Sequence, residues 1–135
     1  MRTLSMLIAS GALLGACSDD GSAGGCVCTQ EFRLFTLTVV DSLGRPEASV
    51  AIEVRSRRTG RLIEVPGGYD GVFGEGTYVI FSDAELDLLP DEGEPVLVTG
   101  EKDTRSFGAD FLFAPEGSCR CHVTRVSGPD TVTIR

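Results

Sequence analysis

The chain of 135 residues carries 20 acidic residues, 12 basic residues and one His, which gives a formal net charge of −8 at pH 7. This length allows one domain with a single core and leaves no room for a second. The acidic balance excludes nucleic acid as a partner, because such binding depends on Lys and Arg side chains that neutralise phosphates.

The chain begins with the features of an export signal. Arg2 supplies a positive charge, residues 4–14 are mostly apolar, and the small residues Gly15 and Ala16 follow them. The apolar run is too short to cross a bilayer, which requires about 20 apolar residues. We therefore predict that residues 1–16 form a signal peptide.

The four residues Leu14-Gly15-Ala16-Cys17 resemble the lipobox of bacterial lipoproteins. The resemblance implies cleavage before Cys17, lipidation of its sulfur and attachment to a membrane through the lipid. Acylation of one of the five cysteines also leaves an even number for pairing. Ser18 implies the outer membrane as destination, at its periplasmic face or at the cell surface. An ordinary signal peptide that leaves Cys17 as a free thiol is the alternative.

A polar segment follows the predicted cleavage site. Residues 18–25 are small or polar and cannot bury enough apolar surface to offset the cost of ordering them. We expect residues 17–25 to be a lipidated Cys with a flexible tether, and residues 26–135 to be the folded domain. Loss of Arg2 with the signal leaves 11 of the 12 basic residues against 20 acidic residues, a formal charge of −9. This charge disfavours anionic lipid head groups as partners.

Alternating apolar residues, β-branched residues and turn residues occur throughout the expected domain. They predict eight short strands, at residues 32–40, 50–55, 61–65, 77–81, 95–99, 107–113, 120–126 and 131–135. Thr59 and Gly60 indicate a hairpin turn between the second and third of these strands. Ser82 and Glu85 form a capping-box pattern ahead of an apolar run that Pro90 ends, which predicts one short helix. The expected fold is an all-β, antiparallel β-sandwich of seven to eight strands.

Three blocks of sequence resemble the carboxypeptidase regulatory-like domains, a transthyretin-like group of sandwiches. The blocks are residues 38–46, residues 48–54 with Thr59-Gly60 behind them, and residues 76–79. The resemblance covers residues 32–81 and implies a seven-stranded sandwich without shared catalytic residues. It also implies a module found in envelope and extracellular proteins, where it serves as a spacer or an interaction domain.

Two C-x-C motifs, Cys26-Val-Cys28 and Cys119-Arg-Cys121, supply the remaining four cysteines. Residues two apart on a strand point to the same face, so neighbouring strands would place four sulfurs together. An exported protein folds in an oxidising compartment, which favours disulfides. Antiparallel strands predict links from Cys26 to Cys121 and from Cys28 to Cys119, although the sequence leaves the connectivity open.

Metal binding is the alternative for these sulfurs. Four thiolates, or three with His122, are ligands for zinc or copper(I). However, His122 directly follows Cys121, so on a strand its side chain points to the opposite face. Zinc sites also usually have wider spacing than C-x-C. A redox-active cysteine pair is a third possibility.

The sequence offers little for catalysis. His122 is the only candidate for a general base near neutral pH. Nucleophile elbows, P-loops, dinucleotide fingerprints and His-Glu-x-x-His motifs are absent from the sequence. The glycine-rich residues 67–76 lack a following Gly-Lys-Ser/Thr and indicate a flexible loop. We expect no enzyme activity, no catalytic residue and no cofactor.

Two charged groups of residues remain. The acidic residues between 83 and 94 fit no EF-hand spacing and are expected to form a solvated helix face and an acidic loop. A basic group is expected at the predicted hairpin tip, formed by Arg55, Arg57, Arg58 and Arg61. It could meet an acidic partner or a phosphate group, or it could keep an edge hairpin from pairing with a neighbour.

These features lead us to expect a non-enzymatic lipoprotein of the cell envelope. Its disulfide-bonded sandwich would act as a binding or accessory module for an envelope protein, a peptide or a glycan. One alternative is a metal-handling lipoprotein that uses the two C-x-C motifs. Another is a small structural subunit of an envelope assembly.

Overall fold

A computed structural model describes residues 25–65 and 73–135 of the chain. The expected signal peptide, Cys17 and nearly all of the tether lie outside the described residues, as does the greater part of the glycine-rich stretch 67–76. Within the described residues, no helix is long and apolar enough to span a membrane.

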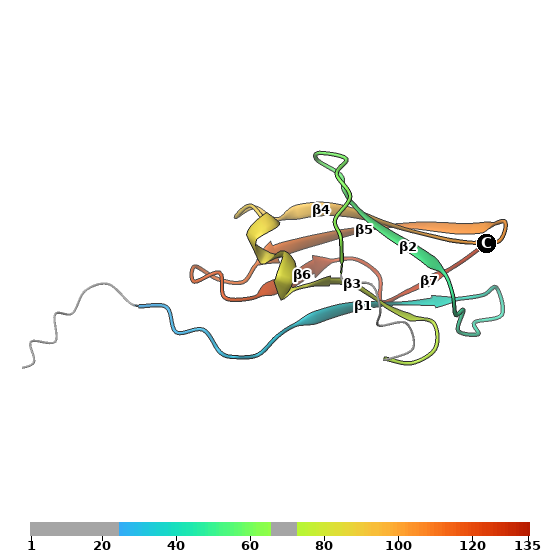
Figure 1. The fold of residues 1–135 in the computed structure, drawn as a ribbon, viewed down its shortest axis with the longest axis horizontal. Coiled ribbons are helices and arrows are strands. Elements are labelled where there is room, and N and C mark those ends of the chain that lie inside the picture. Colours follow the sequence, from blue (N-terminus) through green and yellow to red (C-terminus); the bar gives the residue numbers. More distant parts are fainter. Residues whose placement is uncertain (1–24, 66–72) are drawn as a thin grey trace, which may run out of the picture.

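Strands make up most of the regular structure in the part of the chain described. They are β1 (Leu34–Val40), β2 (Ala51–Ser56), β3 (Thr77–Ser82), β4 (Glu94–Lys102), β5 (Arg105–Pro115), β6 (Val123–Ser127) and β7 (Thr131–Thr133). A short 3₁₀ helix, η1 (Asp83–Leu88), lies between β3 and β4. The strands form two sheets, with the orders β3-β1-β7 and β2-β4-β5-β6, which lie as two layers in Figure 1. The all-β class and the sandwich-like arrangement are therefore confirmed.

One strand pair departs from the predicted antiparallel arrangement. β7 runs parallel to β1, with Thr131 opposite Thr38. The other four pairs among the described strands are antiparallel. A short turn forces β4 and β5 to be antiparallel, whereas the chain leaves β6 in one sheet and crosses to β7 in the other. No hairpin therefore determines the direction of β7.

The strand predicted at residues 61–65 does not form. The chain turns back as expected, and the Ser56 N–H donates to the Arg61 carbonyl at 2.9 Å while the Ile63 N–H donates to the Val54 carbonyl at 2.8 Å. Only an isolated bridge between Arg55 and Leu62 results. Because β2 is an edge strand, the returning segment covers part of an otherwise open edge.

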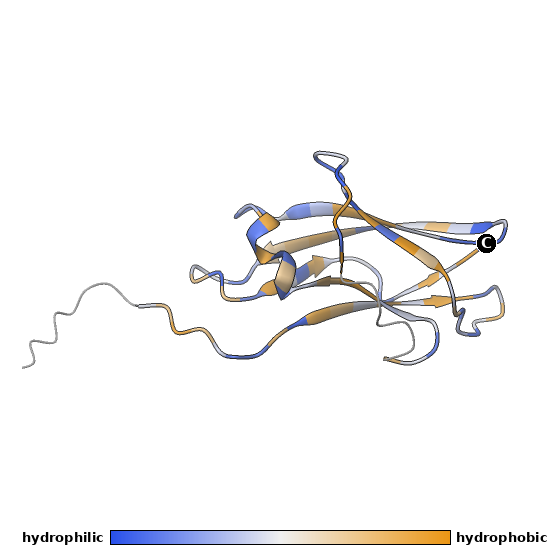
Figure 2. Cartoon of the chain, in the orientation of Figure 1, coloured by the Kyte–Doolittle hydropathy of each residue, from blue (hydrophilic) through white to orange (hydrophobic). Residues whose placement is uncertain are grey.

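The core lies between the two sheets. Leu37 of β1 and the alternate residues Val96 and Val98 of β4 are fully buried, and orange, apolar stretches occur along strands of both layers in Figure 2. Phe81 of β3 stacks on Phe113 of β5 with their ring centroids 4.2 Å apart. This aromatic contact joins the two sheets at the centre of the domain.

The capping box that the sequence predicted is present at η1. The Ser82 hydroxyl accepts a hydrogen bond from the Ala84 N–H at 3.2 Å. In return, the Glu85 carboxylate accepts one from the Ser82 N–H at 2.7 Å. Leu89 ends the helix directly before Pro90, so both its beginning and its end follow from local sequence.

The three sequence blocks at residues 38–46, 48–54 and 76–79 lie close together in the structure. Val39 donates its N–H to the Gly76 carbonyl at 2.8 Å. The Tyr78 hydroxyl accepts from the Val50 N–H at 3.0 Å and donates to the Glu47 carbonyl at 2.7 Å. Gly76 has φ +72°, and a Cβ atom there would lie 2.9 Å from neighbouring backbone atoms. Only glycine fits this close approach.

Candidate functional site

Two disulfides tie the N-terminal segment to the β5–β6 connection, but not with the connectivity predicted. Cys26 is bonded to Cys119 and Cys28 to Cys121, with Cα–Cα distances of 5.4 and 5.3 Å. The prediction assumed two antiparallel strands, whereas neither C-x-C motif lies in a strand. Arg120 lies in a turn with φ +48°, and β6 begins only at Val123. The cysteines pair in chain order, which shows that the two short segments run in the same direction.

The disulfides use all four sulfurs that the metal alternative requires. In residues 25–65 and 73–135, no group of three or more His, Cys, Asp or Glu side chains is placed to hold a metal ion. His122 is buried and contacts Thr29 and Asp83. The imidazole thus makes its two hydrogen bonds within the domain.

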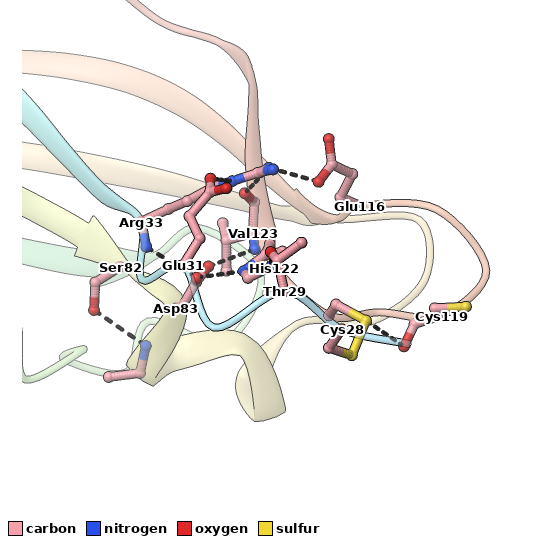
Figure 3. Close-up of polar contacts among 12 residues, drawn as sticks. Cys28, Thr29, Glu31, Arg33, Ser82, Asp83, Glu116, Cys119, His122 and Val123 are labelled. Carbon is pink, nitrogen blue, oxygen red and sulfur yellow. Dashed lines mark hydrogen bonds and ion pairs between the residues drawn. A yellow bond between two sulfur atoms is a disulfide. The ribbon is translucent and has the colours of Figure 1, made fainter. Parts of the chain in front are cut away.

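Thr29, His122 and Asp83 form a hydrogen-bonded relay beside the disulfides (Figure 3). His122 Nδ1 lies 2.8 Å from Asp83 Oδ2, and His122 Nε2 lies 2.8 Å from Thr29 Oγ1. An ionised carboxylate only accepts, so Nδ1 carries the proton that it donates to Asp83. In the neutral ring, Nε2 then accepts from the Thr29 hydroxyl.

Asp83 is the centre of this relay. Its side chain is 8% exposed, and it also accepts hydrogen bonds from the Val123 N–H at 2.7 Å and the Arg33 N–H at 2.9 Å. Burial by itself raises the pKa of Asp83, but the hydrogen bonds from Val123, His122 and Arg33 outweigh it and hold the pKa below its ordinary value. The ionised carboxylate therefore links the chain entering β1 to the chain entering β6.

Arg33 strengthens the same link. Its guanidinium donates to the Val123 carbonyl at 3.4 Å and forms ion pairs with Glu31 at 2.7 Å and Glu116 at 2.6 Å. Figure 3 shows these groups around the relay. The N-terminal segment is thus held by two covalent bonds and by a group of polar contacts.

A hydroxyl, an imidazole and a carboxylate in this order also occur in hydrolases with an activated nucleophile. Thr29 is exposed, and its hydroxyl lies within hydrogen-bond reach of the only imidazole. Catalysis requires in addition a bound substrate and donors for the developing oxyanion. In this domain, the contacts of Asp83 with two backbone N–H groups give the relay a structural use that needs no substrate.

The four arginines expected to form a basic group are mostly paired with carboxylates. The ion pairs join Arg55 to Glu53, Arg57 to Asp110, and Arg58 to both Glu94 and Glu92. Within the described part of the chain, the Arg61 guanidinium makes no hydrogen bond or ion pair. Among the described residues, only Arg61 of the expected basic patch is therefore left without a carboxylate partner.

The acidic run between residues 83 and 94 is not the uniformly solvated surface that was predicted. Asp83 serves the relay, and the buried Glu85 serves the capping box. Glu94 is 3% exposed and accepts hydrogen bonds from the Ser56 hydroxyl and the Arg58 guanidinium. Each buried carboxylate has a specific partner, as the cost of burying a charge requires.

Comparison of the chain with protein-family models, with curated proteins and with solved structures gives no match.

Two residues of the relay were not found from the sequence. Thr29 and Asp83 lie 93 and 39 positions from His122, and no spacing rule connects such distant positions. The one available signal was the position of Thr29 directly after Cys28. A disulfide from Cys28 to the residue that precedes His122 brings Thr29 close to the imidazole.

Proposed function

We propose that the protein is a non-enzymatic lipoprotein of the cell envelope whose disulfide-bonded β-sandwich acts as a binding or accessory module. The observation that carries the proposal is the position of the two disulfides. They lie where the folded domain begins, nine residues after Cys17 of the lipobox-like sequence. Disulfides persist in oxidising compartments, which supports export.

The tether makes the disulfide-bonded end the one nearest to the membrane. Nine residues span at most about 30 Å when fully extended. Each buried CH₂ group of a lipid contributes about 0.8 kcal/mol, so two or three acyl chains hold a protein firmly. Any pull along the tether then reaches the domain at Cys26 and Cys28 and is shared with the β5–β6 connection.

The relay has a structural role in this proposal. It positions residues 29–33 against η1 and the start of β6. The disulfides and the side chain of Arg33 help to hold the same segment in place. Thr29→Val tests whether the relay is catalytic instead, because it removes the hydroxyl from an exposed position and leaves the buried residues intact. We expect wild type and variant to hydrolyse p-nitrophenyl acetate at the same slow rate. Ester hydrolysis by the wild type that disappears in Thr29→Val would contradict the non-enzymatic role.

The membrane anchor is tested with Cys17→Ala and the matched control Ser18→Ala. We expect mass spectrometry to find acyl groups on wild type and Ser18→Ala, and both proteins to fractionate with envelope membranes. Cys17→Ala should lack the lipid and leave the membrane fraction. Cytosolic, unprocessed wild-type protein with reduced cysteines would refute the proposal.

A further inference from the structure

A small pocket lies between the turn after β2 and helix η1. Its volume is about 90 Å³. The buried side chains of Ile63, Phe81 and Leu89 line it, together with Leu62 and Leu88, which are 47% and 48% exposed. An apolar group of a ligand that binds against these half-exposed leucines would be removed from water, which favours its binding.

The charged groups of this pocket favour an anion. Arg58, Arg61 and Glu94 all line it, so the lining carries one net positive charge. Glu94 accepts hydrogen bonds from the Ser56 hydroxyl and the Arg58 guanidinium, so the charges of Glu94 and Arg58 neutralise each other. The exposed guanidinium of Arg61 keeps its five donors, since it has no hydrogen bond or ion pair with the described residues.

We propose that this pocket binds a short aliphatic carboxylate, with the carboxylate paired to Arg61 and the alkyl group against Leu62 and Leu88. This proposal rests on the proposed role as a binding module and names the class of ligand. A cavity of about 150 Å³ accepts benzene, so the smaller pocket admits a branched group of about four carbons. Such a ligand is either the C-terminal Leu or Val of a peptide or a free branched acid.

The choice of ligand follows from both halves of the pocket. The apolar lining alone would accept any small alkyl group, and Arg61 alone would accept any anion. A carboxylate next to a branched alkyl group satisfies both at once, whereas an amide leaves the guanidinium without a charged partner. A bare carboxylate leaves the leucines exposed to water.

The test is a titration of the full-length, ¹⁵N-labelled protein in neutral detergent, followed by NMR. N-acetyl-leucine should shift amide signals of residues 59–63 and 86–89, with a Kd on the order of 1 mM for a ligand of this size. N-acetyl-leucinamide and N-acetylglycine should bind at least about tenfold more weakly, because each lacks one half of the ligand. Binding of N-acetyl-leucinamide as tightly as N-acetyl-leucine would overturn the proposal.

A second titration, with 4-methylpentanoate, distinguishes the two sources of the ligand. Equal affinity for 4-methylpentanoate and N-acetyl-leucine supports a free branched acid. Preference for N-acetyl-leucine supports the end of a peptide. Absence of saturable shifts with both compounds rejects the pocket as a site for aliphatic carboxylates.

Arg61→Gln and its neighbour Arg57→Gln form a matched pair of variants. Both arginines are exposed, but Arg57 is paired with Asp110 and does not line the pocket. Arg61→Gln should weaken N-acetyl-leucine binding about tenfold, and Arg57→Gln should change it less than about twofold. Equal affinities in the two variants would reject Arg61 as the anchor.

Mass spectrometry of the same samples reports acylation of Cys17, so the envelope proposal is judged separately from the pocket.

Discussion

Removal of one disulfide is expected to lower the free energy of unfolding much less than removal of both. The pairs are replaced by serine as Cys26→Ser with Cys119→Ser, as Cys28→Ser with Cys121→Ser, and as all four together. Three of these cysteines are exposed and Cys121 is half-buried. Serine therefore removes little packing, and the change reports mainly the entropy of the unfolded chain.

The magnitudes follow from the positions of the bonds. Each disulfide joins residues 93 positions apart, and closure of a loop of that size contributes about 4.7 kcal/mol in the chain-entropy model. Once one bond exists, the second closes only a small ring that runs through both C-x-C motifs. A ring of about six residues contributes about 2 kcal/mol in the same model. Each pair variant should therefore lose about 2 kcal/mol, and the fourfold variant about 7 kcal/mol.

The assay is equilibrium unfolding in guanidinium chloride, followed by circular dichroism of the full-length proteins without reductant. Val27→Ser is the matched control, because Val27 lies between two of the cysteines and is 93% exposed. Its free energy of unfolding should stay within about 0.5 kcal/mol of wild type. A fourfold variant whose loss equals the sum of the two pair variants would refute the reasoning, because it would show two independent loops.

Three further predictions concern the fold and the relay. Gly76→Ala should cost about 3 kcal/mol and Gly60→Ala about 1 kcal/mol in urea unfolding, because both glycines have φ +72° but only Gly76 is surrounded by close backbone atoms. Phe113→Ala should lower the free energy of unfolding by about 4 kcal/mol, while the exposed Phe32→Ala changes it by less than about 0.5 kcal/mol; similar losses would contradict the aromatic core. Since the pKa of Asp83 is lowered from 3.8, its ionised form stabilises the protein above that pH and the stabilisation is lost as the pH falls below it. Unfolding midpoints measured from pH 6 to pH 2 should fall less steeply in Asp83→Asn than in wild type; equal slopes would argue against an ionised Asp83.

Local sequence was sufficient for the elements whose formation depends on neighbouring residues. The capping box of Ser82 and Glu85 and the turn at Thr59-Gly60 were predicted from residues a few positions apart. Alternation likewise placed the central residues of each of the seven strands in the described part of the chain. It predicted one strand too many at residues 61–65, because alternation does not show how many hydrogen bonds a segment makes with its neighbour.

The sequence by itself determined the all-β class, the short helix and the joining of the two C-x-C motifs, because short-range periodicity, capping and the number of cysteines depend on composition and spacing. Only the tertiary structure decided which cysteines pair, that β7 runs parallel to β1, and that Thr29 and Asp83 meet His122. These features depend on the direction in which distant segments approach each other. That direction is set by packing of the whole domain and leaves no pattern in any short stretch of the chain.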